Sequence, residues 1–140
     1  MTKKRPGTKK PKGIRISESE EQQVVMQWAA MREGQYPELA LFHHIPNGGS
    51  RREGERAKLA AEGVKPGVPD LHLPVARGKW HGLWIEMKAK DGTPSREQLR
   101  WIAMLAAQDN KAVVCYGADQ AIREIVEYMM EDKKNDHDQG

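Results

Sequence analysis

Gly67-Val68-Pro69-Asp70-Leu71 is the stretch of sequence that decides the fold, together with Ile85-Glu86-Met87-Lys88 further along the chain. In the second stretch, and in the residues that follow the first, apolar and polar side chains alternate as they do in a strand with one buried face. Residues 77–82 lie between the two segments and carry the glycines and charged side chains typical of a turn. The pattern therefore predicts a hairpin with strands over residues 71–75 and 83–89.

The strand period predicts which side chains of this hairpin lie together. Alternate residues of a strand point to opposite faces, so Glu86 and Lys88 share one face, and Asp70 lies on the face opposite Leu71. In a hairpin, the start of the first strand lies beside the end of the second, which brings Asp70 close to Glu86 and Lys88. Two carboxylates beside a lysine could hold a divalent metal next to a phosphate. The alternative is an ordinary solvated strand face, with Asp70 as a turn residue after Pro69.

The rest of the chain alternates helices and strands, as an α/β domain does. Helices are predicted over residues 17–33, 51–61, 94–109 and 119–130, and further strands over 39–45 and 112–116. This order predicts a mixed central sheet flanked by helices. The apolar residues expected to face the core are Val24, Val25, Trp28 and Met31 of the first helix, Leu99, Ile102, Leu105 and Ala106 of the third, and Ile122, Ile125, Val126 and Met129 of the last.

Length and charge divide the chain into one domain and two tails. The 140 residues suit a single core. Residues 1–15 contain seven of the 23 Lys and Arg residues and no acid, so the remainder carries a net charge of −4. We expect a basic disordered tail over residues 1–15, a globular domain over 16–131 and a polar C-terminal tail over 132–140. The basic tail either contacts phosphates or serves as a solubilising end.

Composition also limits the setting in which the protein works. No apolar run approaches the roughly 18 residues of a membrane-spanning helix, and the basic N-terminus is not followed by the apolar segment of a secretory signal. Cys115 is the single cysteine and lies in an apolar run, so no internal disulfide is possible. We therefore expect a cytoplasmic protein with no membrane partner.

Three motifs together resemble the VRR-NUC family, the virus-type replication-repair nucleases of the PD-(D/E)XK superfamily. They are Gly67 to Leu71, Trp84-Ile85-Glu86-Met87-Lys88, and Gly92-Thr93-Pro94-Ser95 with Gln98. The resemblance extends over residues 17–130. It implies a restriction-endonuclease-like core and a metal-dependent DNA endonuclease that cuts branched DNA, such as Holliday junctions or flaps. It also implies Mg²⁺ or Mn²⁺ as cofactor and a small homodimer, as in phage and bacterial members.

The resemblance also assigns roles around the hairpin. It implies that Asp70 and Glu86 are metal ligands, that Met87 lends its main-chain carbonyl, and that Lys88 is the catalytic lysine. Gln98 matches a glutamine of the family on the helix after this strand, and the resemblance implies that it is a catalytic residue that helps to position the substrate or the lysine. Because Ser95 and Gln98 also have capping-box spacing, a purely structural role for Gln98 stays open.

The first helix offers two candidates for a further carboxylate. Glu18 lies four residues ahead of Gln22, which matches the spacing in the family, and we take Glu18 as the expected catalytic residue. Glu21 is the rival, because Glu18 and Glu21 lie on the same stripe of the helix. For either residue, the alternative is an acid favoured by the helix dipole in the first turn.

The loop before the second helix is the expected DNA contact. Its Asn47-Gly48-Gly49-Ser50 turn resembles the family's loop between the first strand and the active site, and it is followed by a basic cluster. The expected DNA-binding residues are Asn47, Ser50, Arg51, Arg52 and Arg56. Two other functions remain possible: a non-catalytic DNA-binding module with a vestigial site, and a restriction or recombination nuclease on the same core.

Overall fold

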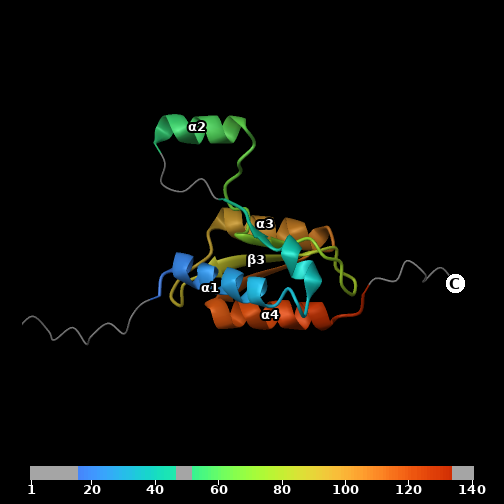
Figure 1. The fold of residues 1–140 in the computed structure, drawn as a ribbon. Helices are drawn as coiled ribbons and strands as arrows, with labels where there is room; N and C mark the ends of the chain where they lie inside the picture. Colours follow the sequence, from blue (N-terminus) through green and yellow to red (C-terminus); the bar gives the residue numbers. More distant parts are fainter. Residues whose placement is uncertain (1–15, 47–51, 134–140) are drawn as a thin grey trace, which may run out of the picture.

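The computed structural model describes residues 16–46 and 52–133. Along this part of the chain, helices alternate with short strands (Figure 1). The elements in order are α1 (Glu18–Met31), η1 (Pro37–Leu41), β1 (His43–His44), α2 (Glu53–Ala61), β2 (Leu71–Leu73), β3 (Leu83–Lys88), α3 (Arg96–Ala107), β4 (Lys111–Tyr116) and α4 (Ala118–Met130).

The strands form one mixed sheet in the order β1-β2-β3-β4. β1 with β2 and β2 with β3 are antiparallel, whereas β3 and β4 are parallel. The predicted hairpin is therefore confirmed, with Leu71 opposite Ile85 and Leu73 opposite Leu83. The α/β fold with a mixed central sheet and flanking helices is confirmed as well.

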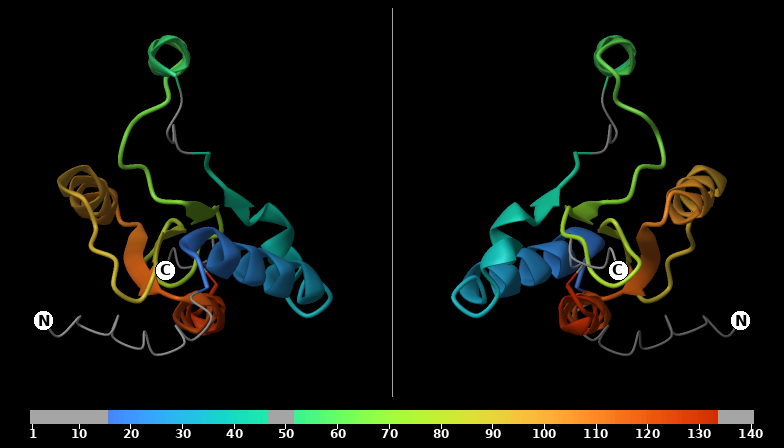
Figure 2. Two further views of the ribbon diagram at one scale, coloured as in Figure 1. Left: turned by 90° about the vertical axis from the view of Figure 1, so that its left-hand side faces the viewer. Right: turned by 90° about the vertical axis from the view of Figure 1, so that its right-hand side faces the viewer.

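The core lies between the sheet and the pair α1 and α4. Leu71, Leu73, Leu83, Ile85 and Met87 are fully buried on one face of the hairpin, because they alternate with the polar residues. α1 and α4 cover this face, and α3 lies on the other side of the sheet against β4 (Figure 2). The helix side of the core is formed by Val25, Ala29, Ala118, Ala121, Ile125, Tyr128 and Met129.

The segment before β1 corrects the predicted strand over residues 39–45. Residues 37–41 form a 3₁₀ helix, and only His43 and His44 pair as a strand. Pro37 stands at the start of this helix, where its fixed φ suits a helical turn. The predicted strand over 71–75 is also too long, because β2 ends at Leu73 and the next residue, Pro74, has no N–H for the ladder.

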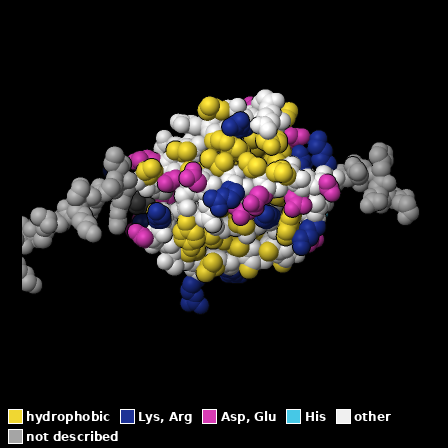
Figure 3. All heavy atoms as spheres, turned by 90° about the horizontal axis from the view of Figure 1, so that it is seen from below, with side chains coloured by type: hydrophobic (Ala, Val, Ile, Leu, Met, Phe, Trp, Pro, Cys, Tyr) yellow, Lys and Arg dark blue, Asp and Glu magenta, His cyan; other side chains and the backbone are white. Residues whose placement is uncertain are grey.

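The expected core faces of two helices were partly wrong. On α1, Val25 is buried, whereas Val24 is 44% exposed and Met31 is 84% exposed. On α3 no residue is fully buried, and Leu99 is 51% exposed. Hydrophobic side chains consequently remain on the outside of the molecule, as the view from below shows over α1 and α4 (Figure 3). On α4, Ile125 and Met129 are buried as expected, and Ile122 and Val126 are half-buried.

α2 differs from the other helices, because it stands apart from the body of the domain (Figures 1 and 2). It has no buried residue. Among the described residues, no helix has the length and apolar character that crossing a membrane requires.

Candidate active site

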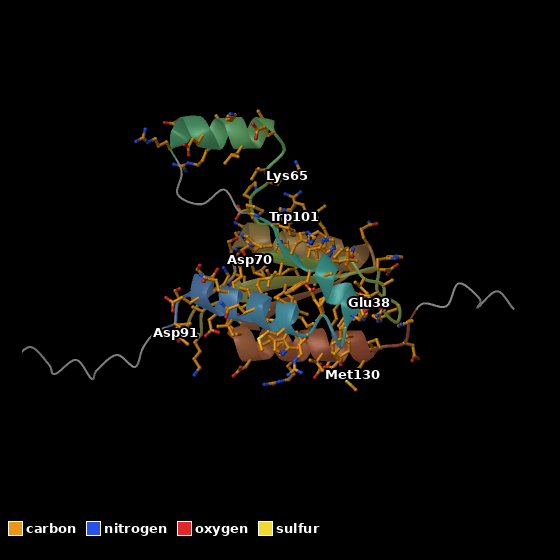
Figure 4. The ribbon with its side chains drawn as sticks, viewed as in Figure 1. Glu38, Lys65, Asp70, Asp91, Trp101 and Met130 are labelled. Carbon is orange, nitrogen blue, oxygen red and sulfur yellow. The ribbon has the colours of Figure 1, made fainter. Side chains whose placement is uncertain are left out.

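Three carboxylates meet at one end of the sheet. Figure 1 shows that α1, α3 and α4 begin at this end. Glu18, Asp70 and Glu86 each offer an oxygen, and these three atoms lie within 4.8 Å of one another. Glu18 lies in the first turn of α1, Asp70 directly before β2, and Glu86 within β3. Asp70 and Glu86 are only 7% and 1% exposed. The sequence expectation that Asp70 lies near Glu86 is thus met in space (Figure 4 labels Asp70).

Asp70 is fixed through both its side chain and its backbone. Its Oδ2 accepts a hydrogen bond of 2.8 Å from the backbone N–H of Met87. Its carbonyl oxygen lies 2.8 Å from the Nδ1 of His44 and accepts a second bond from the N–H of Ile45 at 2.8 Å. Because a carbonyl oxygen can only accept, Nδ1 of His44 is the donor. Strand β1 therefore holds the start of β2 in register beside Glu86.

Glu86 is held on one oxygen and unpaired on the other. Its Oε1 accepts a hydrogen bond of 2.8 Å from the side-chain nitrogen of Gln98 and lies 3.4 Å from Nζ of Lys88. Its Oε2 is buried and has no hydrogen-bond partner among the described residues. Burial, and then the nearby Asp70 carboxylate, raises the pKa of Glu86 to about 8. A buried carboxylate oxygen without a donor, next to two other carboxylates, fits a divalent cation.

Lys88 has a restricted position beside this cluster. Its side chain is 11% exposed, and its ammonium pairs with Glu86. A Cβ added at Gly92 would lie 3.3 Å from Cδ of Lys88, a tight contact that would make the lysine side chain shift slightly. The ion pair with Glu86 holds the ammonium at the site.

Gln98 closes the cap of α3 and also contacts Glu86. Its backbone N–H donates to Oγ of Ser95, and its Oε1 accepts from the backbone N–H of Ser95, which completes a capping box at the start of α3. The remaining amide nitrogen donates to Glu86. The cap therefore orients the side chain that contacts the carboxylate.

The two candidates on the first helix occupy different places. Glu18 belongs to the carboxylate cluster. Glu21 instead accepts a hydrogen bond of 2.6 Å from the N–H of Ala118, the first residue of α4. Because an acid at a helix start pairs with free N–H groups and the helix dipole, Glu21 acts as a cap for α4. The contact between Glu21 and Ala118 is a tertiary contact, so the spacing of residues along the first helix could not predict it.

The expected DNA-binding residues are only partly described. Asn47, Ser50 and Arg51 lie outside the described residues. Arg52 and Arg56 are exposed at the start and in the first half of α2, apart from the carboxylate cluster. The structure thus brings neither arginine to the three carboxylates.

Two residues near the site were not singled out from the sequence for the parts they play. His44 fixes the backbone of Asp70, and its place opposite Leu71 could have been found only from the pairing of β1 with β2. Trp101 donates from its indole nitrogen to the carbonyl of Pro66 at 3.0 Å, close to the Gly67 to Leu71 motif. Trp101 lies three residues after Gln98 on the same helix, and this spacing is the one feature of the sequence that places it near the site.

Comparison with known proteins agrees with this geometry. The family model described as VRR-NUC domain matches residues 14–119. Among solved structures, a protein described as a VRR_NUC domain protein has a TM-score of 0.72 and 36% sequence identity to this chain, over 84% of this chain and 91% of that chain. A search of curated proteins found no significant match. With the family model covering most of the chain, the protein belongs to the VRR-NUC domain family of nucleases.

Proposed function

We propose that this protein is a metal-dependent deoxyribonuclease, an endonuclease that hydrolyses phosphodiester bonds in branched DNA such as Holliday junctions or flaps. The observation that carries the proposal is the group Glu18, Asp70 and Glu86, with ligand atoms within 4.8 Å of one another, beside Lys88. Family membership supports a nuclease and DNA as its substrate. In this proposal the nuclease domain spans residues 16–131 and acts as a homodimer.

The carboxylate cluster is the proposed metal site. Glu18, Asp70 and Glu86, with the main-chain carbonyl of Met87, would hold Mg²⁺, and Mn²⁺ would substitute because both ions favour oxygen ligands. The unpaired Oε2 of Glu86 supports this assignment, since a cation would satisfy it. When bound, such an ion lowers the pKa of a water molecule and offsets negative charge on the phosphoryl oxygens.

Lys88 and Gln98 are the proposed catalytic and positioning side chains beside the metal ligands. A lysine ammonium has three protons to donate, and the contact with one oxygen of Glu86 leaves it able to donate elsewhere. The ammonium can donate to a phosphate oxygen and stabilise its charge as the phosphoryl group is attacked. Gln98 does not need to contact DNA; it holds Oε1 of Glu86 so that this carboxylate keeps one orientation.

DNA contacts are proposed for residues 47–51 and for helix α2. Arg52 and Arg56 of α2, with Asn47, Ser50 and Arg51, would contact phosphates, which positions the substrate without reading its sequence. The seven basic residues among residues 1–15 would add a salt-dependent contribution to binding.

The test is cleavage of end-labelled four-way junction, flap, linear duplex and single-stranded DNA in Mg²⁺, Mn²⁺ and EDTA. We expect metal-dependent cutting of the junction or flap, which Asp70→Ala abolishes. Asp132→Ala is the matched control, because Asp132 is exposed beyond the end of α4. Binding without cutting in every metal would favour the DNA-binding module, and equal cutting of linear duplex would favour a restriction-type or recombination nuclease.

A further inference from the structure

A half-open cavity of about 740 Å³ lies between α3 and the segment at Lys65 and Pro66. Its walls are mostly apolar and include Pro66, Trp101, Met104 and Leu105. Trp101 is half-buried, and Met104 is 57% exposed, so an aromatic ring and a thioether face an open space. Cavities of about 300–1,000 Å³ are typical of sites that bind small ligands or single groups of larger ones.

The aromatic wall of this cavity is fixed before any ligand binds. The indole N–H of Trp101 donates to the carbonyl of Pro66 at 3.0 Å. Directly after Pro66, a Cβ added at Gly67 would lie 2.6 Å from the backbone carbon of Glu97. Only glycine at this position therefore allows the segment to pack so closely against α3. The indole therefore loses little conformational freedom when a flat group stacks on it.

Both walls of the cavity lead to the carboxylate cluster. On one side, Pro66 is followed after Gly67, Val68 and Pro69 by Asp70, and four residues of chain span at most about 14 Å. On the other side, Trp101 lies one helical turn after Gln98, which donates to Glu86. The labelled Lys65, Trp101 and Asp70 follow one another in this direction in Figure 4.

The charges at the rim identify the kind of ligand. Lys65 and Arg100 are exposed lining residues, and Glu97 is the acid among the lining residues. A site that combines an aromatic face with cations at its rim suits a nucleotide, because the base has a flat apolar face and the phosphate is negative. An apolar segment of a second copy would not need two cations there.

We propose that this cavity binds an unpaired nucleotide of the DNA substrate, with its base stacked on Trp101 and its phosphate near Lys65 and Arg100. The inference rests on the proposed function, because it makes the cavity a part of the same DNA site. Bases inside a duplex are already stacked and cannot enter. The cavity thereby favours DNA with a single-stranded branch close to the scissile phosphate.

The test is DNA binding in EDTA, where cleavage is not needed as a readout. Fluorescein-labelled duplex with one single-stranded branch is compared with fully paired duplex of the same length, by anisotropy. We expect Trp101→Ala to weaken binding of the branched DNA by about 5- to 150-fold, the range for loss of one base–aromatic stack, with affinity for paired duplex unchanged. Trp101→Phe should retain most of the affinity. Leu99→Ala is the control, since Leu99 is exposed on the same helix outside the cavity.

A second variant covers the case in which Trp101→Ala does not fold, which circular dichroism would show. Arg100 is exposed, so Arg100→Ala should fold and should weaken branched DNA more than duplex, with a smaller salt dependence. Equal binding of branched DNA by wild type and both folded variants would overturn the proposal. So would a wild-type dimer that Trp101→Ala converts to a monomer in sedimentation, because a second copy would then be the occupant.

Cleavage assays of the same proteins separate this inference from the proposed function. If wild type cuts DNA with Mg²⁺ and Trp101→Ala binds and cuts branched DNA equally well, the inference fails and the nuclease assignment stands. If wild type cuts nothing in any metal but loses branched-DNA affinity on Trp101→Ala, the nuclease assignment fails and the nucleotide site stands.

Discussion

The side-chain nitrogen of Gln98 lies 2.8 Å from Oε1 of Glu86, while the oxygen of the same amide accepts the N–H of Ser95. One side chain thus closes the capping box of α3 and contacts a proposed metal ligand. A change at the start of this helix would therefore reach the carboxylate cluster without touching a carboxylate.

This double contact separates two variants that damage the same cap. Ser95→Ala and Gln98→Ala should each lower the free energy of unfolding by about 1 kcal/mol, the usual cost of a lost N-cap interaction. Only Gln98→Ala also frees Oε1 of Glu86, so it should reduce kcat well beyond Ser95→Ala. Urea denaturation and single-turnover cleavage would measure the two effects. Equal losses of kcat would mean that Gln98 acts only as a cap.

Glu86→Gln should abolish cleavage and leave DNA binding intact or improved, because it removes a ligand and a negative charge from the site. At the proposed metal site, Mg²⁺ or Mn²⁺ should raise the melting temperature of the wild type, since a ligand that binds the native state stabilises it, and Glu86→Gln should remove this rise. Glu33→Gln, at an exposed position, is the control. An undiminished metal-induced shift in Glu86→Gln would remove Glu86 from the ligand set.

Lys88→Ala should lower the cleavage rate by about 10²- to 10³-fold, as expected when one donor to a developing oxyanion is lost. DNA affinity should change much less. Lys90→Ala provides the comparison, because Lys90 is exposed just beyond β3. The measurement is the rate at saturating protein against the Kd from anisotropy, and a defect confined to Kd would place Lys88 outside the reaction.

Tyr128 gives the fold a specific response to alkaline pH. Its hydroxyl donates to the carbonyl of Val75, and burial raises its pKa from 10.0 to about 12. Because the folded-state pKa is the higher one, the stability that this hydroxyl contributes is complete below pH 10 and is lost as pH rises through about 12. Tyr128→Phe should lower stability at neutral pH by about 1–3 kcal/mol, since the carbonyl of Val75 is left unpaired.

The check is urea denaturation of both proteins from pH 7 upward. The stability difference between wild type and Tyr128→Phe should narrow above pH 10. A constant difference over that range would show that the hydroxyl does not titrate with the fold.

Deletion of residues 1–13 should weaken DNA binding and flatten its dependence on salt, because fewer counterions are released when fewer lysines and arginines contact phosphates. Thermal unfolding of the domain should be unchanged. A full-length variant with the same tail residues in shuffled order should bind like wild type. An unaltered salt slope after the deletion would identify the tail as a solubilising end.

The hairpin and the closeness of Asp70, Glu86 and Lys88 could be predicted from the sequence, because a period of two residues and a short turn fix both faces and register. The choice between Glu18 and Glu21 could not. Both lie on one helical stripe, and the difference is set by the N–H of Ala118, which lies far along the chain.

The helix faces show the same limit from another side. The apolar residues of α3 indicate an inward face, yet Leu99 is 51% exposed and Trp101 turns to the chain before β2. A hydrophobic pattern shows which residues are available for burial, and the neighbours decide which are used. For the segment before β1, by contrast, Pro37 in the sequence favours the start of a helical turn, whereas the apolar residues after it favour a strand; the structure has the 3₁₀ helix.

The contact between Glu21 and the start of α4 has a consequence for synthesis of the chain. A ribosome makes α1 early. Ala118, whose N–H donates a hydrogen bond to Glu21, is made only when most of the chain is complete. Glu18 lies three residues ahead on the same helix, so we expect its final placement to follow the docking of α4. In the proposed nuclease, a chain terminated before Ala118 would lack this contact, so full assembly of the carboxylate cluster would wait for nearly complete synthesis.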